Sequence, residues 1–344
     1  MADRGRRRPT ILDVARLAGV SKSTVSNVVR GLPSVSPETR RRVRRAIDRL
    51  GYRPNVLARD LARRRTTLIG ALVSGLADPF SAALLGSLER AASVRGYGLL
   101  VAATEARADL ERERLDDLLR YRVAGLLFLA SSGDPAVARE LRAQDVPAVF
   151  ISCRGTAGDA VVVDDVRGGL TVATHLLALG HTRIAYVSGH AVEASTDRAR
   201  LAGLRRGLTA RGLQPTAILP WRLGPDGRPE ASAVARIATL LARRGGPTAV
   251  VCANDACAID VLDLADRLGL AVPARLSVVG FDDIPLAGLA RISLTTVAQP
   301  LPELARLGIG RLIDRIEGRR QGPPEVRLLE PRLVRRATTG PAPA

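Results

Sequence analysis

The sequence is poor in several residue types, and each shortage excludes a class of protein. Aromatic residues make up 3% of the 344 residues, and there are only three cysteines and three histidines. The cysteines lack CxxC spacing and have no histidine cluster beside them, so we expect small buried thiols rather than a metal or redox site. The longest apolar runs are too short for a membrane span. The N-terminus lacks the apolar core of a secretory signal, so we expect a cytoplasmic protein.

Sequence patterns of the common enzyme classes are also missing. The chain has no GxSxG, GxxxxGK[ST] or HExxH pattern, and no GxGxxG after a strand. Acidic pairs such as Asp116 and Asp117 fall on polar helix faces, where solvated side chains are the expected arrangement. We therefore predict a protein that is not an enzyme and that has no cofactor and no metal.

Positive charge is abundant and unevenly placed. Residues 1–65 hold 17 arginines and one lysine against five acids, a net charge of +13, whereas the whole chain carries +18. A high-arginine proteome would explain why Lys22 is the only lysine, but it does not explain this clustering. The asymmetry indicates a polyanion-binding module joined to a more nearly balanced body.

Helix signals divide the basic segment into three short helices. Thr10 and Asp13 form a capping-box pattern, and Gly19 ends the apolar stripe that follows. Ser21 can cap a second helix, and Ser36–Pro37 begins a third. Two short helices joined by three residues, with a third to complete a small core, are typical of a helix-turn-helix.

The second helix has two contrasting faces. Val25, Val28 and Val29 share one face, while the opposite face carries small polar side chains and Lys22. No acidic or bulky side chain lies on the polar face, so it suits a groove lined by hydrogen-bonding groups. In a helix-turn-helix this helix enters the major groove of DNA.

The stretch TILDVARLAGVSKSTVSNVVRGLPSVSPETRRRVRRAIDRLGYRPNVLARDLA resembles the DNA-binding headpiece of the LacI/GalR repressor family at nearly every position. The resemblance implies that base edges are read by Lys22, Ser23 and Asn27. It implies phosphate contacts or helix caps at Ser21, Thr24, Ser26 and Asn55, although Ser26 fits a solvated helix face equally well. In the family's hinge helix, Leu61 matches the leucine that wedges into the minor groove, with Arg59 beside it.

The rest of the chain alternates short apolar strands with helical segments. Repeated βα alternation indicates parallel sheets flanked by helices, and the pattern restarts near residue 166, which predicts two lobes. The expected fold is therefore an all-α headpiece followed by a two-lobed α/β domain like that of periplasmic sugar-binding proteins. The predicted boundaries are 1–54 for the headpiece, 55–65 for the hinge, 66–165 with 297–326 for lobe 1, and 166–296 with 327–344 for lobe 2.

The same family resemblance extends over most of this body, through DPF, GHTRIAYVSG, RLAGLRRGL, PTAVVCAND, VPARLSVVGFDDIPLA and LTTVAQP. It implies an effector site between the lobes, at the carboxyl ends of the strands. The implied effector-binding residues are Phe80, Arg154, Asp164, Thr196, Arg200, Asn254 and Asp282. Arg154 and Asp164 could equally form an ion pair between the lobes, and we expect Asp255 to cap the helix that follows it.

The function implied is a homodimeric repressor whose binding to a near-palindromic operator responds to a small effector. A sugar-like polyol is favoured, because Arg, Asp and Asn suit vicinal hydroxyls and the chain has few aromatics. A corepressor-dependent regulator that senses a nucleoside, a purine or a phosphorylated metabolite is the alternative. A sugar-transport component would need a signal peptide and no headpiece. A nonspecific architectural DNA binder would not need a two-lobed domain.

Overall fold

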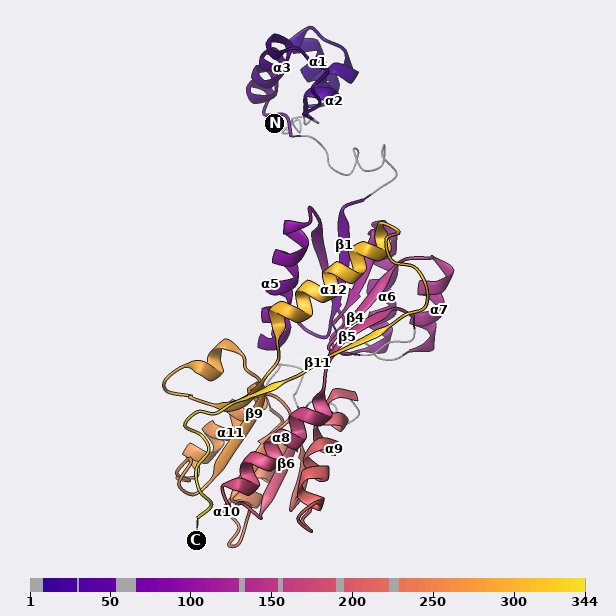
Figure 1. The fold of residues 1–344 in the computed structure, drawn as a ribbon. Helices are drawn as coiled ribbons and strands as arrows, with labels where there is room; N and C mark the ends of the chain where they lie inside the picture. The colour runs from indigo at the N-terminus through magenta and orange to yellow at the C-terminus, as the bar shows by residue number, and fades with distance from the viewer. Residues whose placement is uncertain are drawn as a thin grey trace. The chain divides into compact units, whose positions relative to one another are not determined.

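The computed structural model describes residues 9–29, 31–53, 66–129, 134–153, 157–189, 195–222 and 229–343. The chain divides into two compact units, Met1–Thr66 and Thr67–Ala344. In the first unit, called the headpiece below, three helices surround a small apolar core (Figure 1). They are α1 (Ile11–Ala18), α2 (Lys22–Val29) and α3 (Pro37–Leu50).

Local capping fixes the ends of these helices as the sequence predicts. Asp13 N donates to Thr10 Oγ1 at 3.4 Å and Thr10 N donates to Asp13 Oδ2 at 2.8 Å, which completes a capping box on α1. Gly19 ends α1 with φ 62°, a left-handed conformation that glycine adopts without strain. Ser36 caps α3 by accepting from Thr39 N at 3.3 Å.

The second unit contains two lobes, and the first is a six-stranded parallel sheet covered on both faces. Across the sheet its strands are β11 (Val326–Leu329), β5 (Asp159–Val163), β4 (Ala148–Ile151), β3 (Gly125–Phe128), β1 (Leu68–Val73) and β2 (Gly98–Ala103). Apolar side chains alternate between the two faces, as the pleat of a strand requires. One face packs on α5 (Pro79–Val94) and α12 (Leu301–Ile316), and the other packs on α6 (Ala108–Arg120) and α7 (Pro135–Ala143).

The second lobe repeats this arrangement with one strand reversed. Its strand order is β12 (Arg332–Val334), β10 (Thr295–Ala298), β9 (Ser277–Asp282), β8 (Ala249–Cys252), β6 (Ile184–Ser188) and β7 (Ala217–Pro220), and only β12 runs antiparallel to its neighbour. One face packs on α8 (Asp165–Ala178) and α9 (Ser195–Thr209). The other packs on α10 (Ala231–Ala242) and α11 (Asp255–Arg267), and a short 3₁₀ helix, η1 (Pro285–Gly288), follows β9.

The chain passes between the lobes three times: between β5 and α8, between β10 and α12, and between β11 and β12. The first and third passages are joined, because Asp164 N donates to Leu329 O at 2.9 Å and Arg167 lies 2.6 Å from Glu330. The predicted lobe boundaries near 297 and 327 need correction. Residues 297–298 end β10 in lobe 2, and residues 327–329 belong to β11, which pairs with β5 in lobe 1.

The segment after β12 lies along the edge of the second lobe where its strands begin. Thr338 Oγ1 donates to Val278 O at 2.7 Å and accepts from Thr295 N at 2.9 Å. The fully buried His181 contacts Gly340 O through Nε2 at 3.0 Å. This packing gives His181 a structural role.

Candidate functional site

In the headpiece, α2 presents the polar face predicted from the sequence. Val25 and Val28 are buried in the headpiece core, whereas Lys22 and Ser23 are exposed and Asn27 is half-buried. The helix therefore keeps its apolar face for packing and leaves polar groups at the surface.

A hydroxyl network holds the start of α2. Ser21 Oγ accepts from Thr24 N at 3.1 Å and lies 2.8 Å from Ser23 Oγ and 2.9 Å from Thr24 Oγ1. Ser21 is therefore a helix cap, one of the two roles expected for it, and Ser26 lies half-buried one turn further along α2. The predicted contacts Asn55, Arg59 and Leu61 lie outside the described residues, as does Arg154 of the effector set.

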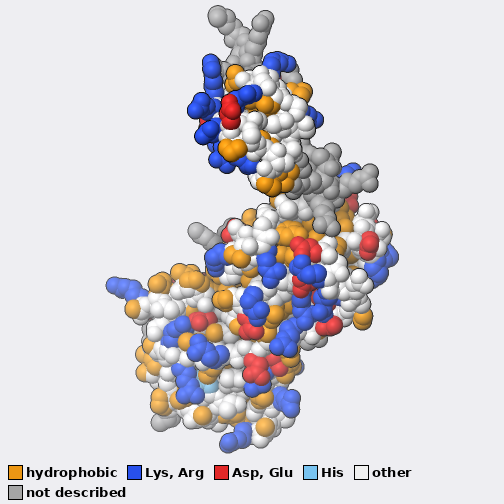
Figure 2. Space-filling view, turned by 45° about the horizontal axis from the view of Figure 1, so that its top comes forward, with side chains coloured by type: hydrophobic (Ala, Val, Ile, Leu, Met, Phe, Trp, Pro, Cys, Tyr) orange, Lys and Arg blue, Asp and Glu red, His pale blue; other side chains and the backbone are white. Residues whose placement is uncertain are grey.

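Charge differs between the two units on the surface shown in Figure 2. Lys and Arg side chains gather on the headpiece with few acidic ones among them, while both signs are interspersed on the larger unit. This distribution favours a polyanion at the headpiece.

In the second unit, Arg200 of α9 lies at the carboxyl edge of the second sheet. Its Nε donates to Asp165 Oδ1 at 2.8 Å and its Nη1 donates to Ala253 O at 2.5 Å, and the guanidinium stacks 3.7 Å from the centre of the Phe281 ring. Its Nη1 also lies 3.6 Å from Asp282 Oδ1. Arg200 thus holds together the start of α8 and the ends of β8 and β9.

These three charged side chains are almost enclosed, with 12% of Arg200, 11% of Asp165 and 7% of Asp282 exposed. Burial lowers the pKa of Arg200, but the two carboxylates together raise it by more than burial lowers it, so the net shift is upward. Burial raises the pKa of Asp282 well above its ordinary value, against the opposing effect of Arg200. Gln299 Nε2 donates to Asp282 Oδ1 at 2.7 Å, which ties this carboxylate to the second passage between the lobes.

Glycines allow the close approach that positions Arg200. A Cβ on Gly169 of α8 would stand 2.0 Å from Arg200 O, and a Cβ on Gly203 of α9 would stand 2.0 Å from Val166 O. The two helices therefore pack backbone to backbone. This brings the start of α8, with Asp165, against α9.

A small cavity of about 130 Å³ lies between the lobes beside this cluster. Ser152 and Asp164 line it from the end of lobe 1, and Asp165 and Thr196 line it from lobe 2. The Ser152 Oγ is buried and has no hydrogen-bond partner among the described residues. Asp164 also caps α8, because its Oδ1 accepts from Arg167 N at 2.9 Å.

The end of β8 differs from expectation. Asn254, not Asp255, caps α11, since its Oδ1 accepts from Cys257 N at 2.8 Å. Asp255 is fully buried and accepts from Ile284 N at 2.8 Å and from Thr296 Oγ1 at 2.5 Å. The prediction that Asp255 caps the helix is therefore wrong, and Asn254 has a structural role at the strand end.

Phe80, in the first turn of α5, is half-buried and packs against the apolar cores of both lobes. Asp78 caps the same turn by accepting from Ser81 N at 3.0 Å. Its negative charge also raises the pKa of Asp282, after the larger effect of burial, so the first lobe contributes to the electrostatics of the cluster.

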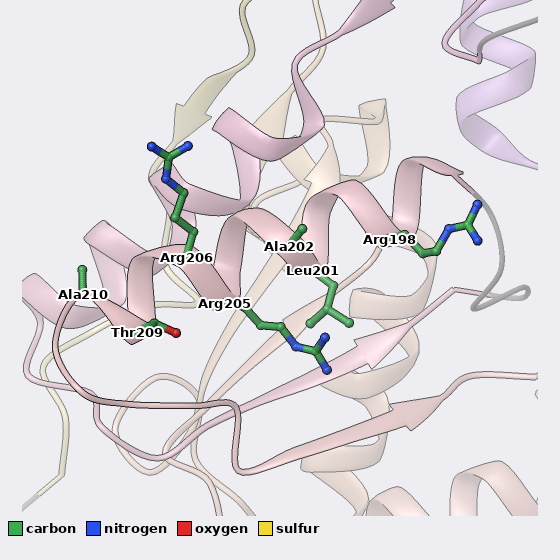
Figure 3. A pocket seen from close by; sticks show the side chains of 7 residues that line it. All are labelled: Arg198, Leu201, Ala202, Arg205, Arg206, Thr209 and Ala210. Carbon is green, nitrogen blue, oxygen red and sulfur yellow. The ribbon is translucent and has the colours of Figure 1, made fainter.

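The outer side of α9 carries a separate, shallow hollow of about 670 Å³ (Figure 3). Its lining residues come from α9 and from the residue that follows it: Arg198, Leu201, Ala202, Arg205, Arg206, Thr209 and Ala210. None of the predicted effector-binding residues lines it, and a single helix cannot enclose a ligand. The cavity between the lobes is therefore the better candidate site.

Comparisons with known proteins relate both units of the chain to described families. Residues 10–55 match the family model described as bacterial regulatory proteins, lacI family, and residues 173–339 match that of the periplasmic binding protein-like domain. The regulator DegA of Bacillus subtilis is 32% identical over 97% of this chain and 99% of its own. The ribose operon repressor of Escherichia coli is 36% identical over 89% and 93% of the two chains. The chain belongs to the lacI family.

A solved structure supports the same assignment. The lac repressor dimer bound to operator and an anti-inducer superposes with a TM-score of 0.84 and 30% identity, covering 97% of this chain and 100% of that one. These findings confirm that this lacI-family protein is a DNA-binding transcriptional regulator and not an enzyme, and they confirm the predicted fold class.

Sequence reasoning missed several residues at the cluster of this lacI-family regulator. Asp165, Phe281 and Gln299 all contact Arg200 or Asp282. Trp221 was also missed; it directly follows β7 at the same edge and its Nε1 donates to Asp260 Oδ2 at 3.0 Å. As the only tryptophan, placed directly after a strand, it could have been found from the sequence.

Two further features concern membranes and metals. In the ranges that the structure describes, none of the helices combines the length and the apolar character needed to cross a bilayer. Within those same ranges, no three His, Cys, Asp or Glu side chains gather into a group that could hold a metal ion.

Proposed function

We propose that this regulator is a cytoplasmic, homodimeric repressor whose operator binding is controlled by a sugar-like effector bound between the two lobes. The polar cluster of Arg200, Asp165 and Asp282, next to the cavity between the lobes, is the observation that carries the proposal. It presents fixed hydrogen-bond donors and acceptors at the carboxyl edge of a sheet, where ligands of α/β folds bind.

For DNA, we propose that α2 lies in the major groove and that Lys22, Ser23 and Asn27 read base edges. A lysine can donate to guanine N7 and O6, an asparagine can pair bidentately with adenine, and a serine suits either base. Ser21, Thr24, Ser26 and Asn55 then position the headpiece on phosphates, and Arg59 and Leu61 act in the minor groove. Two copies would bind the halves of a near-palindromic operator.

For the effector, Asp164, Thr196, Arg200 and Asp282 supply the polar groups. Phe80 offers one apolar face, and Arg154 and Asn254 complete the proposed set. Carboxylates that accept from hydroxyls, beside an arginine that donates to them, suit a polyol. Phe281 lies under Arg200 rather than open to a ligand, so few aromatic faces remain for a purine. The passages between the lobes would carry the response, and operator and effector must affect each other's affinity by the same factor.

The experiment is fluorescence anisotropy of the full-length protein on its own upstream DNA and on scrambled DNA at fixed salt, with a panel of sugars. We expect a preference for the upstream DNA that one sugar abolishes. Thr196→Val should weaken the response to that sugar at unchanged DNA affinity, while Thr239→Val, an exposed threonine on α10, should not. A ligand that tightens DNA binding would establish corepression instead, and a response only to nucleosides or phosphorylated metabolites would contradict the sugar assignment.

A second experiment tests the minor-groove wedge. Leu61→Ala should weaken binding to upstream DNA far more than binding to scrambled DNA, because unstacking a base step serves only the bent specific complex. An equal loss on both DNAs would contradict the assignment of Leu61.

A further inference from the structure

The α1–α2 turn is held from outside by an arginine of α3. Arg42 Nη2 donates to Ala18 O at 2.7 Å and to Gly19 O at 3.1 Å, and Arg42 Nε lies 3.3 Å from Ala18 O. The guanidinium fork therefore spans the last residue of α1 and the first residue of the turn.

These two carbonyls need an external donor. The last carbonyls of a helix have no partner within the helix. Earlier ones are satisfied locally, since Val20 N donates to Ala15 O at 3.1 Å and Gly19 N donates to Arg16 O at 3.3 Å. A cation is also favoured at this end of α1 by the helix dipole. The turn residues Gly19 and Val20 have no polar side chain that could serve instead.

The packing of α2 leaves its orientation dependent on that turn. Only Val25 and Val28 of α2 are fully buried, and both are short side chains in a small core. At its start, α2 is held by the Ser21 cap. A shift of the turn would therefore move the cap at the start of α2 and, with it, the polar face of that helix.

We propose that Arg42 is a positioning residue for sequence recognition: its fork fixes the α1–α2 turn and thereby the orientation in which α2 meets base edges. The inference rests on the proposed role of α2 in the major groove. Arginine suits this position because its planar fork donates to two acceptors at once, which a lysine ammonium does with less fixed geometry.

The test uses a duplex selected by the full-length protein from a random-sequence library, with a scrambled duplex for comparison. Arg42→Met removes the donors and one charge, and Arg45→Met removes the same charge from an exposed site on the same helix. We expect the affinity of both variants for scrambled DNA to fall by the same small factor. On the selected duplex, Arg42→Met should lose about tenfold more affinity than Arg45→Met. A factor of this order is expected for hydrogen bonds from a charged donor. Arg42→Lys should recover part of that loss.

A stability control separates positioning from folding. Ala46→Gly destabilises the same headpiece core without touching the turn. If Ala46→Gly loses as much selectivity as Arg42→Met at an equal unfolding midpoint, the inference is overturned. It is also overturned if Arg42→Met loses equal affinity on both duplexes, because Arg42 would then act as a phosphate contact. A wild-type protein with no preference for the selected duplex would remove the proposed role of α2, and this inference with it.

Discussion

Gly203 of α9 lies so close to Val166 of α8 that a Cβ at position 203 would stand 2.0 Å from the Val166 carbonyl oxygen. No side-chain rotation relieves such a contact, because both partners are backbone or fixed to it. The helix pair that carries Asp165 and Arg200 therefore depends on the absence of one methyl group.

Gly203→Ala is accordingly expected to force the two helices apart and to lower the free energy of unfolding by about 3 kcal/mol. Gly310→Ala is the matched control, since Gly310 lies inside α12 with no heavy atom within 4 Å of its added Cβ. Alanine favours a helix by up to about 1 kcal/mol over glycine, so the control should be neutral or stabilising. Urea unfolding followed by circular dichroism checks both. Equal effects of the two substitutions would contradict the close contact.

Removal of the Arg200 side chain should be costly for a different reason. Arg200→Met leaves Asp165 and Asp282 nearly buried and close together without a cation, for which a loss of about 3–5 kcal/mol is expected. The loss should be smaller at pH 5 than at pH 8, because the unpaired carboxyls can then take up protons. Trp221 fluorescence during urea unfolding measures it. An Arg198→Met variant, altered on the outer side of the same helix, should stay near wild type; equal stability of the two variants would exclude the ion cluster as a stabilising feature.

Asp255 predicts a pH dependence with a definite sign. Burial raises the pKa of Asp255 from 3.8 to about 7, opposed by the hydrogen bonds from Thr296 and Ile284. The folded state therefore holds the proton more tightly than the unfolded chain. Stability from this group is greatest below pH 4 and is lost as the pH rises to about 7, by on the order of 4 kcal/mol.

Asp255→Asn should remove this loss, because an amide cannot ionise and can still accept from Ile284 N and donate to Thr296. The difference in urea midpoint between the variant and wild type should grow from pH 4.5 to pH 7.5 in favour of the variant. Asp116→Asn, at an exposed site on α6, serves as control. A difference that does not change with pH would show that Asp255 is not the titrating group.

The pH dependence of stability expected from Asp159 has the opposite sign to that expected from Asp255. Its side chain is fully buried, and it accepts from Arg315 Nε at 2.9 Å and from Glu325 N at 2.7 Å. Burial raises the pKa of Asp159, but Arg315 and the Glu325 amide together lower it by more than burial raises it, so the net shift is downward. The stability it contributes is present above its ordinary pKa and is lost as the pH falls below it.

Asp159→Asn should therefore destabilise the first lobe at pH 7 by about 2–4 kcal/mol, since the arginines at the end of α12 lose their buried counter-charge. The urea midpoint at pH 7 is the measurement. Asp314→Asn, also on α12, alters a more exposed ion pair with Arg319 beyond the end of that helix and should change the midpoint little. A midpoint equally insensitive to both substitutions would refute the role assigned to Asp159.

Local chemistry explains why the headpiece could be predicted almost in full. The caps at Thr10, Ser21 and Ser36 each accept a hydrogen bond from the backbone three residues further on, and Gly19 ends α1 through its own left-handed conformation. These interactions are local, so they can be read from neighbouring residues in the sequence. The larger unit was predicted as far as its βα alternation allows. The stretch LLEPRLVRR at residues 328–336 shows strand character but does not show which sheet edge it joins, so the split between β11 and β12 was not foreseen.

The candidate site shows the same limit. The family resemblance pointed to Arg200 and Asp282, and the structure places them 3.6 Å apart. Asp165 was missed because it lies 35 residues before Arg200 in the chain. The two side chains meet only because Gly169 and Gly203 allow α8 and α9 to pack backbone to backbone. Asn254 and Asp255 are adjacent and similar, and only the burial of Asp255 by Thr296 and Ile284 decides which of them caps α11.

The three passages between the lobes also set the order in which the protein can be completed on the ribosome. Until nearly the whole chain has been made, the first sheet lacks β11 and the helix α12 that packs on it. The second sheet lacks β10, β12 and the segment after β12 that contains Thr338. The headpiece needs only residues up to Thr66. At about 5–20 residues per second, a nascent chain carries a complete basic headpiece for roughly 15–55 seconds before either sheet can close. The headpiece can thus be complete on the ribosome while both sheets of the larger unit still lack strands.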